Sequence, residues 1–172
     1  GPRNATLQEF GDDPDPFWDA FHEIEEPQQR AEATYLHDDA AALLRTLTDR
    51  STPVGLVTHC QEFLTDPVLR HLDIDDWFDT VVCCTDELGW KPDPEPVRQA
   101  MAGLGVDTDH HGALVGDAAV DIGAAWNAGL DSVHVERHGH DTRGRCVLGD
   151  YRVNTLDALL AAPATDGGVD DA

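Results

Sequence analysis

Short apolar runs alternate with helical patterns along most of this chain, and that alternation restricts the folds open to it. The apolar runs at 54–57, 80–84, 113–117 and 132–136 are separated by segments whose apolar residues recur at helical spacing. Strands joined through helices pair in parallel, because a parallel pair needs a long crossover connection. The sequence therefore predicts an α/β protein with a Rossmann-like three-layer fold, in which helices cover both faces of a central parallel sheet.

The connecting helices are predicted from the same spacing and from their end signals. Residues 38–49 place three leucines on one face of a helix. Pro94 begins another helix, at a position where its missing N–H costs nothing. Nearer the N-terminus, aromatic residues at helical spacing predict a short amphipathic helix over about 15–26. The remaining predicted elements are helices at 61–71, 94–104, 121–128 and 155–160 and a strand at 151–153.

The charge balance limits the partners of this chain. It carries 34 acidic residues against 11 basic ones, for a formal charge of -23. Nucleic acid and anionic membrane surfaces are therefore excluded as expected partners, because both are polyanions. Lysine is almost absent, which favours a halophilic protein from a high-salt cytoplasm, where counterions screen the self-repulsion. The alternative is an acidic protein with a basic partner.

Signals for export or membrane insertion are missing from the sequence. No run of 18 apolar residues occurs, and the N-terminal residues contain no apolar signal core. The four cysteines form no CxxC pair, so reduced thiols in a cytoplasmic protein are the simplest interpretation. Because the chain does not begin with Met, we expect it to start inside a longer reading frame, or after processing or cloning.

Lys91 is the only lysine, since the other ten basic residues are arginines. A compact ammonium on a flexible stem suits a phosphoryl oxygen or a buried carboxylate, which a planar guanidinium does not match. Its neighbours, Gly89-Trp90-Lys91-Pro92-Asp93-Pro94, mark a loop between a strand and a helix. The alternative is an ordinary lysine on a surface loop.

Polar residues follow two of the predicted strands, at the sheet edge where α/β proteins bind ligands. Thr58 and His59 follow the first apolar run, where a hydroxyl and helix N–H groups would seat an anion. Asp117 and Asp121 follow the third run at one-turn spacing, and their oxygens suit Mg²⁺. The alternatives make Thr58 and Asp121 helix N-caps and Asp117 a turn former.

Together these segments resemble the haloacid dehalogenase-like hydrolase superfamily. The strand ending in Thr58, the Lys91-Pro92-Asp93-Pro94 loop and the segment Leu114-Val115-Gly116-Asp117-Ala118-Ala119-Val120-Asp121 look like its second, third and fourth motifs. The resemblance covers about 36–160, and helical-cap phosphatases similar to phosphoglycolate phosphatase are the nearest look-alikes. The fourth segment is the most specific part of the match.

The resemblance implies a Mg²⁺-dependent phosphatase acting on a small phosphorylated metabolite. Thr58 would hydrogen-bond the phosphoryl oxygens, and Lys91 would neutralise the phosphoryl group and the nucleophile. Asp117 would hold Mg²⁺, with Asp121 as a further ligand or as a support behind it. His59 would contact the phosphate or substrate, with a surface histidine as the alternative. Positioning and charge stabilisation do most of the work in phosphoryl transfer.

The family's first motif, a DxD after an N-terminal apolar strand, has no clear match. Its first aspartate is the nucleophile, but Asp13-Pro14-Asp15 follows no apolar strand. We therefore expect the nucleophile strand and part of the cap to be missing. This expectation divides the chain into a cap remnant or linker at 1–34, a core domain at 35–161 and a disordered acidic tail at 162–172. We also expect self-association, for which a homodimer is one form.

Two further interpretations stay open. The chain could be a non-catalytic binding module of the same fold, or a subunit completed by another polypeptide; dehalogenase chemistry is a minor alternative. In addition, His134, Glu136, His138, His140 and Cys146 have spacings at which zinc ligands occur, although a solvated loop explains them better.

Overall fold

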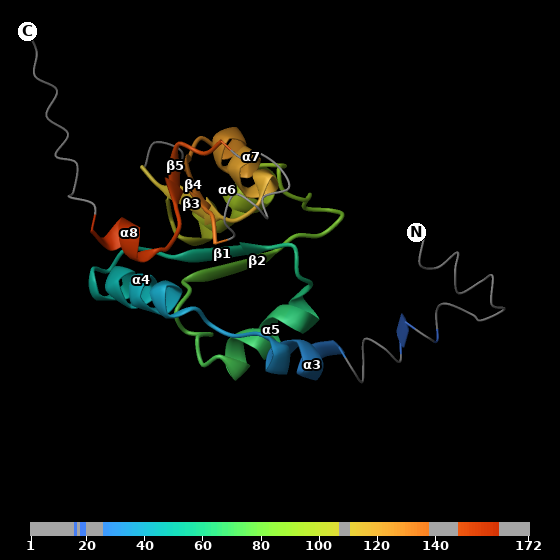
Figure 1. Cartoon of the computed structure of the whole chain (residues 1–172). Helices are drawn as coiled ribbons and strands as arrows, with labels where there is room; N and C mark the ends of the chain where they lie inside the picture. Colours follow the sequence, from blue (N-terminus) through green and yellow to red (C-terminus); the bar gives the residue numbers. More distant parts are fainter. Residues whose placement is uncertain (1–15, 17, 20–25, 107–110, 138–147, 162–172) are drawn as a thin grey trace, which may run out of the picture.

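The computed structural model describes residues 16, 18–19, 26–106, 111–137 and 148–161. Strands and helices alternate along this part of the chain, as predicted (Figure 1). The strands are β1 (Gly55–Thr58), β2 (Thr80–Cys83), β3 (Ala113–Gly116), β4 (Asp131–Val135) and β5 (Tyr151–Val153). The helices are α3 (Glu26–Ala33), α4 (Asp38–Asp49), α5 (Glu62–His71), α6 (Glu95–Gly103), α7 (Ala119–Ala128) and α8 (Asp157–Leu160).

All strand pairs are parallel, but the strands form two separate groups. β1 pairs with β2, with Thr58 opposite Cys83. β4 pairs with β3 on one side and with β5 on the other. Within the described residues, β1 and β3 each pair with only one strand. The predicted α/β fold with parallel strands is therefore confirmed, with its sheet divided between β1 and β3.

The free edges of β1 and β3 are identified by the direction of their backbone groups. The carbonyls of Val54 and Thr58 accept hydrogen bonds from residues of the β2 region, so the even-numbered residues of β1 face β2. The Gly112 carbonyl accepts from the Asp131 N–H, so the even-numbered residues of β3 face β4. Because backbone direction alternates along a parallel strand, Gly55 and Val57 of β1 and the odd-numbered residues of β3 face the opposite way.

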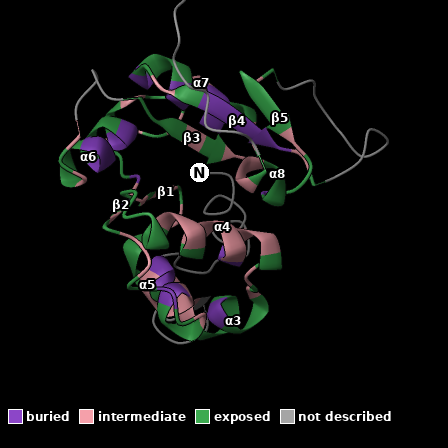
Figure 2. Ribbon diagram, turned by 90° about the vertical axis from the view of Figure 1, so that its left-hand side faces the viewer, coloured by how far each residue is buried: buried purple, intermediate pink, exposed green. Residues whose placement is uncertain are grey.

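Helices lie on both sides of the strands. In both views α6 and α7 lie on one side of β1 and β2, and α4 and α5 lie on the other (Figures 1 and 2). Figure 2 shows buried purple segments in α5, β4, α6 and α7, and α6 and α7 bury theirs in part against each other. Their shared cluster consists of Val97, Met101, Ala124 and Ala128, against which Val106, Leu114 and Leu130 pack. The small alanines of α7 let the two helices approach closely, which holds the two strand groups together.

The element boundaries agree with the sequence to within about two residues, except near the N-terminus. Helix α3 was not predicted, because its sequence is polar; of its described side chains, at 27–33, Ala31 alone is buried. It packs against α5. Of the helix predicted over about 15–26, Pro16, Trp18 and Asp19 are helical, and most of its other residues lie outside the described part. The predicted tail at 162–172 lies wholly outside it.

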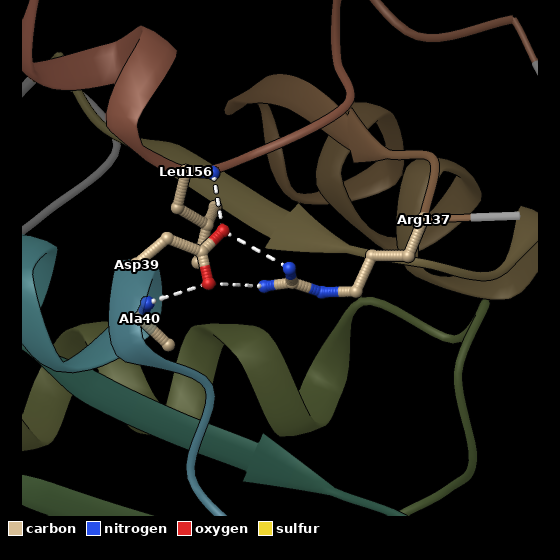
Figure 3. Close-up of polar contacts among 4 residues, drawn as sticks. All are labelled: Asp39, Ala40, Arg137 and Leu156. Carbon is tan, nitrogen blue, oxygen red and sulfur yellow. Dashed lines mark hydrogen bonds and ion pairs between the residues drawn. The ribbon is translucent and has the colours of Figure 1, made fainter.

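Asp39 at the start of α4 joins three distant segments (Figure 3). Its two carboxylate oxygens accept hydrogen bonds from the two terminal nitrogens of Arg137, each at 3.0 Å. The same carboxylate accepts the Leu156 N–H at 2.7 Å and the Ala40 N–H at 2.9 Å. A bidentate pair of this kind fixes orientation as well as distance. Asp39 therefore links α4 to Arg137, which follows β4, and to Leu156, which precedes α8.

Candidate active site

Thr58 ends β1 with its hydroxyl in a tight turn. Its Oγ1 accepts the N–H of Cys60 at 3.0 Å, while its carbonyl accepts the N–H of Cys84 at 2.8 Å. The N-cap of α5 is Gln61, so the alternative that Thr58 caps this helix is wrong. The hydroxyl lies at the carboxyl end of the strand and keeps its proton free to donate to a ligand oxygen.

The loop that carries Lys91 is fixed at both ends. Gly89 has a φ of 102°, a left-handed conformation that a β-carbon would strain. Asp93 then precedes the next helix, α6, and accepts the N–H of its first residue, Glu95, at 3.0 Å. On the side of α7, the Asn127 amide donates to the Pro92 carbonyl at 2.9 Å. These contacts set the direction in which the intervening Lys91 side chain leaves the loop.

Lys91 connects the two strand groups. Its Nζ lies 2.7 Å from Asp121 Oδ1 and donates to the Val57 carbonyl at 3.1 Å. Val57 belongs to β1 and this carbonyl faces its free edge, whereas Asp121 belongs to α7, the helix after β3. The side chains of Lys91 and Asp121 are only 12% and 9% exposed. The alternative of an ordinary surface lysine is therefore wrong.

Asp121 is held by more than its ion pair. Its Oδ2 accepts the Ala118 N–H at 3.0 Å, which makes Asp121 the third residue of the helix and not its N-cap. A β-carbon at Gly116 would collide with the Asp121 side chain. The absence of a side chain at Gly116 therefore makes room for Asp121. Both carboxylate oxygens are thus occupied, so Asp121 orients Lys91 in this arrangement.

Asp117 follows β3 directly and is exposed. Its carboxylate lies at the carboxyl end of the strand, where the sequence predicted a Mg²⁺ ligand. The described residues contain no group of three or more histidine, cysteine or acidic side chains placed to hold a metal ion. Mg²⁺ usually takes one or two protein carboxylates and completes its octahedron with water and substrate oxygens. Asp117 therefore fits as one protein ligand of Mg²⁺, and the remaining ligands would have to be supplied from outside the described residues.

His59 and Trp90 form an aromatic pair beside these residues. Their ring centroids are 5.4 Å apart and the rings meet edge to face at 76°. Trp90 Nε1 also donates to Asp86 Oδ1 at 3.0 Å. Partial burial lowers the pKa of His59, the charge of Lys91 lowers it further, and Asp121 opposes both.

The sequence matches a family of known hydrolases. Residues 2–135 match the model of the haloacid dehalogenase-like hydrolase family. The chain belongs to this family. It is 36% identical over 120 residues to "Phosphoglycolate phosphatase, plasmid" of Cupriavidus necator, a match that covers 69% of this chain and 51% of that protein. It is 34% identical over 102 residues to the phosphoglycolate phosphatase of Escherichia coli K12, covering 59% and 40%. The chain thus spans about half the length of these relatives or less.

Solved structures of haloacid dehalogenase-like proteins share the fold. A HAD phosphatase from Thermococcus onnurineus aligns with a TM-score of 0.70 and 25% identity, covering 91% of this chain and 67% of that one. A "putative haloacid dehalogenase-like hydrolase" from Bacteroides fragilis aligns with a TM-score of 0.65 and 27% identity, covering 75% and 61%. The resemblance inferred from three short motifs is therefore confirmed at the level of family and fold.

The structure brings some predicted site residues together and leaves others untested. Contacts join Lys91 to Asp121 and to the strand that carries Thr58. The pairing of Trp90 with His59 was not predicted, although each is the immediate neighbour of a predicted phosphate-binding residue. The predicted first-motif candidate at 13–15 lies outside the described residues, as do His138, His140 and Cys146 of the histidine-rich segment.

In the described part of the chain, no helix could cross a membrane.

Proposed function

We propose that this chain forms the phosphoryl-binding part of a Mg²⁺-dependent phosphatase for a small phosphorylated metabolite. The observation that carries the proposal is the position of Lys91 Nζ, 3.1 Å from a β1 carbonyl and 2.7 Å from a carboxylate after β3. A cation at that junction would face both the phosphoryl group and an attacking carboxylate. Thr58 would donate its hydroxyl to a phosphoryl oxygen, and Lys91 would neutralise the charge that develops in the transition state.

We further propose that the nucleophile belongs to a strand that inserts between β1 and β3. Both strands have an edge that no described strand pairs with, and on the β1 edge the Val57 carbonyl also accepts a hydrogen bond from Lys91. One extended segment would satisfy both edges, and its carboxyl end would bring an aspartate close to Thr58 and Lys91. Neither a hydroxyl nor an ammonium can replace that carboxylate. The chain would then be truncated relative to the complete enzyme, with residues 1–34 as the remaining part of its cap.

Mg²⁺ would bind to Asp117 and the inserted carboxylate, where it would neutralise phosphoryl charge and hold the ester in line. Asp121 would support this site indirectly by fixing Lys91, because its own oxygens are already hydrogen-bonded. The donor set is all oxygen, as Mg²⁺ requires. Asp117→Asn is therefore the variant that would weaken Mg²⁺ binding most.

The test compares this chain with a chain extended by the native residues encoded upstream of Gly1. We expect little or no hydrolysis of generic phosphate esters with Mg²⁺ by the unextended chain, and turnover by the extended one. Replacing the first aspartate of the added DxD by Asn should abolish that turnover. Robust activity of the unextended chain that disappears in Asp13→Asn would overturn the proposal and make 13–15 the first motif.

A second candidate is a non-catalytic subunit or binding module of the same fold, completed by another polypeptide. The free edges of β1 and β3 support it, because a strand from a different chain would satisfy them equally well. The upstream reading frame distinguishes the two candidates. An in-frame apolar strand that ends in DxD supports the phosphatase, and its absence supports the subunit.

A further inference from the structure

The aromatic pair of His59 and Trp90 directly adjoins both proposed phosphate-binding residues. His59 follows Thr58 at the end of β1, and Trp90 precedes Lys91 in the next loop that approaches the site. A phosphoryl group held by Thr58 and Lys91 would leave its ester oxygen near these two rings. The rings touch each other edge to face, with centroids 5.4 Å apart, so they form one continuous surface.

This surface is held in place before any ligand arrives. Trp90 is 40% exposed, yet its indole N–H donates to Asp86 at 3.0 Å and its ring meets His59. A large aromatic side chain fixed at two points loses little conformational freedom on binding, which favours affinity. Trp90 is therefore placed as a contact surface and not as a freely moving side chain.

The surroundings indicate which chemistry this surface accepts. Trp90 also lines a cavity of about 450 Å³ at the carboxyl end of β2, which Thr58, His59 and Lys91 do not line, so Trp90 is the residue that this cavity shares with the aromatic pair. That volume suits a small ligand. Four of the lining residues are acidic and none is basic, the acidic ones being Glu62, Asp66, Asp86 and Glu87. An ester with a second negative charge would be repelled here, whereas a neutral ring would gain contact area.

We propose that His59 and Trp90 contact the alcohol portion of the phosphate ester and select uncharged alcohols that carry a ring over short acidic ones. This inference rests on the proposed phosphatase function and adds the substrate class. Aromatic side chains favour flat partners, through offset or edge-to-face contacts with another ring and through packing against its C–H groups. The binding energy would come from the alcohol portion and would add to that of the phosphoryl group.

The experiment measures the dissociation constants of three probes with the full chain by titration calorimetry. The probes are inorganic phosphate, phenyl phosphate and 2-phosphoglycolate. We expect phenyl phosphate to bind about tenfold more tightly than phosphate, a difference of about 1.4 kcal/mol. Phosphoglycolate should bind no more tightly than phosphate, because its carboxylate adds repulsion.

Variants separate the contact surface from the phosphate seat. Trp90→Leu should remove the advantage of phenyl phosphate and leave the affinity for phosphate within about twofold, while Trp90→Phe should retain most of the advantage. His59→Asn should reduce the advantage in part. Trp126→Leu is the matched control, because Trp126 is also exposed and also donates its indole N–H to an aspartate, at 2.9 Å.

Each result has a distinct meaning. If phosphate binds and Lys91→Ala weakens it, but phenyl phosphate gains nothing over phosphate, the inference fails and the proposed function stands. If Trp90→Leu and Trp126→Leu behave alike, the inference fails as well. If the parent chain does not bind phosphate, or if Lys91→Ala leaves phosphate binding unchanged, the proposed function fails and the inference falls with it.

Discussion

At the scale of single residues, the charge of Lys91 is matched inside the protein before any substrate is present. A phosphoryl group would meet an ammonium whose position is already set by Asp121 and the Val57 carbonyl. The conformational entropy of the Lys91 side chain is therefore lost on folding and not on binding. Such preorganisation distinguishes this lysine from a flexible surface cation.

The shape of the cation at position 91 should matter as much as its charge. Lys91→Arg should not restore the phosphate or vanadate binding that Lys91→Ala loses, because the guanidinium fork is wider than the ammonium that fits between Val57 and Asp121. Equilibrium titration of both anions with the three chains checks this expectation. Full binding by the Arg variant would contradict the proposed role of Lys91.

The ion pair between Lys91 and Asp121 should contribute strongly to stability. Asp121→Asn would leave the ammonium buried without a counter-charge, and losses of about 3–5 kcal/mol are typical when one partner of a buried pair is removed. Urea unfolding measures the loss. Asp66→Asn is the control, because its pair with Arg70 is exposed and should contribute about 1 kcal/mol or less.

A double variant tests the explanation for that loss. Lys91→Met with Asp121→Leu removes both charges and fills similar volume, so it should be less destabilised than Asp121→Asn alone. A double variant at least as unstable as the single one would mean that packing or the Ala118 N–H contact, and not the unpaired charge, dominates.

At the scale of elements, the sequence predicted what depends on local pattern. The apolar runs and helical spacing located nearly every strand and helix, and Gly129 ends α7 in a left-handed conformation with a φ of 80°. Helix α3 was missed because it has almost no apolar face. Contacts between distant residues, such as Lys91 with Asp121, follow from how the elements pack, and no spacing in the sequence encodes them.

The carboxylate of Asp39 connects elements that are far apart in the chain, and it should make their packing sensitive to acid. Hydrogen bonds from Arg137 and then from the Leu156 N–H lower its pKa from 3.8 to about 2. A carboxyl whose pKa is lower in the folded state stabilises the fold above its unfolded pKa. This stabilisation should therefore be complete above about pH 5 and decline between about pH 4 and 2.

Comparison with Asp39→Asn measures this contribution. The difference in unfolding free energy between the parent and the variant should be constant from about pH 5 to 8 and shrink below about pH 4. Asp38→Asn, in the same first turn of α4, is the control and should show a much smaller difference. A difference for Asp39→Asn that does not change with pH would mean that its ionisation contributes nothing.

At the scale of the whole molecule, charge repulsion should dominate the response to salt. With a formal charge of -23, the surface repels itself at low ionic strength. The Debye length falls from about 10 Å at 0.1 M to about 3 Å at 1 M salt. We expect the Tm to rise from dilute buffer to molar KCl in a thermal melt. A flat or falling Tm would contradict a halophilic origin of this composition.

The division of the sheet also predicts which backbone amides exchange their hydrogen slowly in deuterated water and which exchange it fast. In β1 the backbone N–H groups of Leu56 and Thr58 face β2, whereas those of Gly55 and Val57 face the free edge. In β3 the N–H groups of Ala113 and Val115 face the free edge. Exchange should therefore alternate residue by residue, slow and fast, along β1 and β3, as it should along β2 and β5, which also pair with one strand each among the described residues. A strand that filled the space between β1 and β3 would erase the alternation in these two strands, so this pattern records whether the central position of the sheet is occupied.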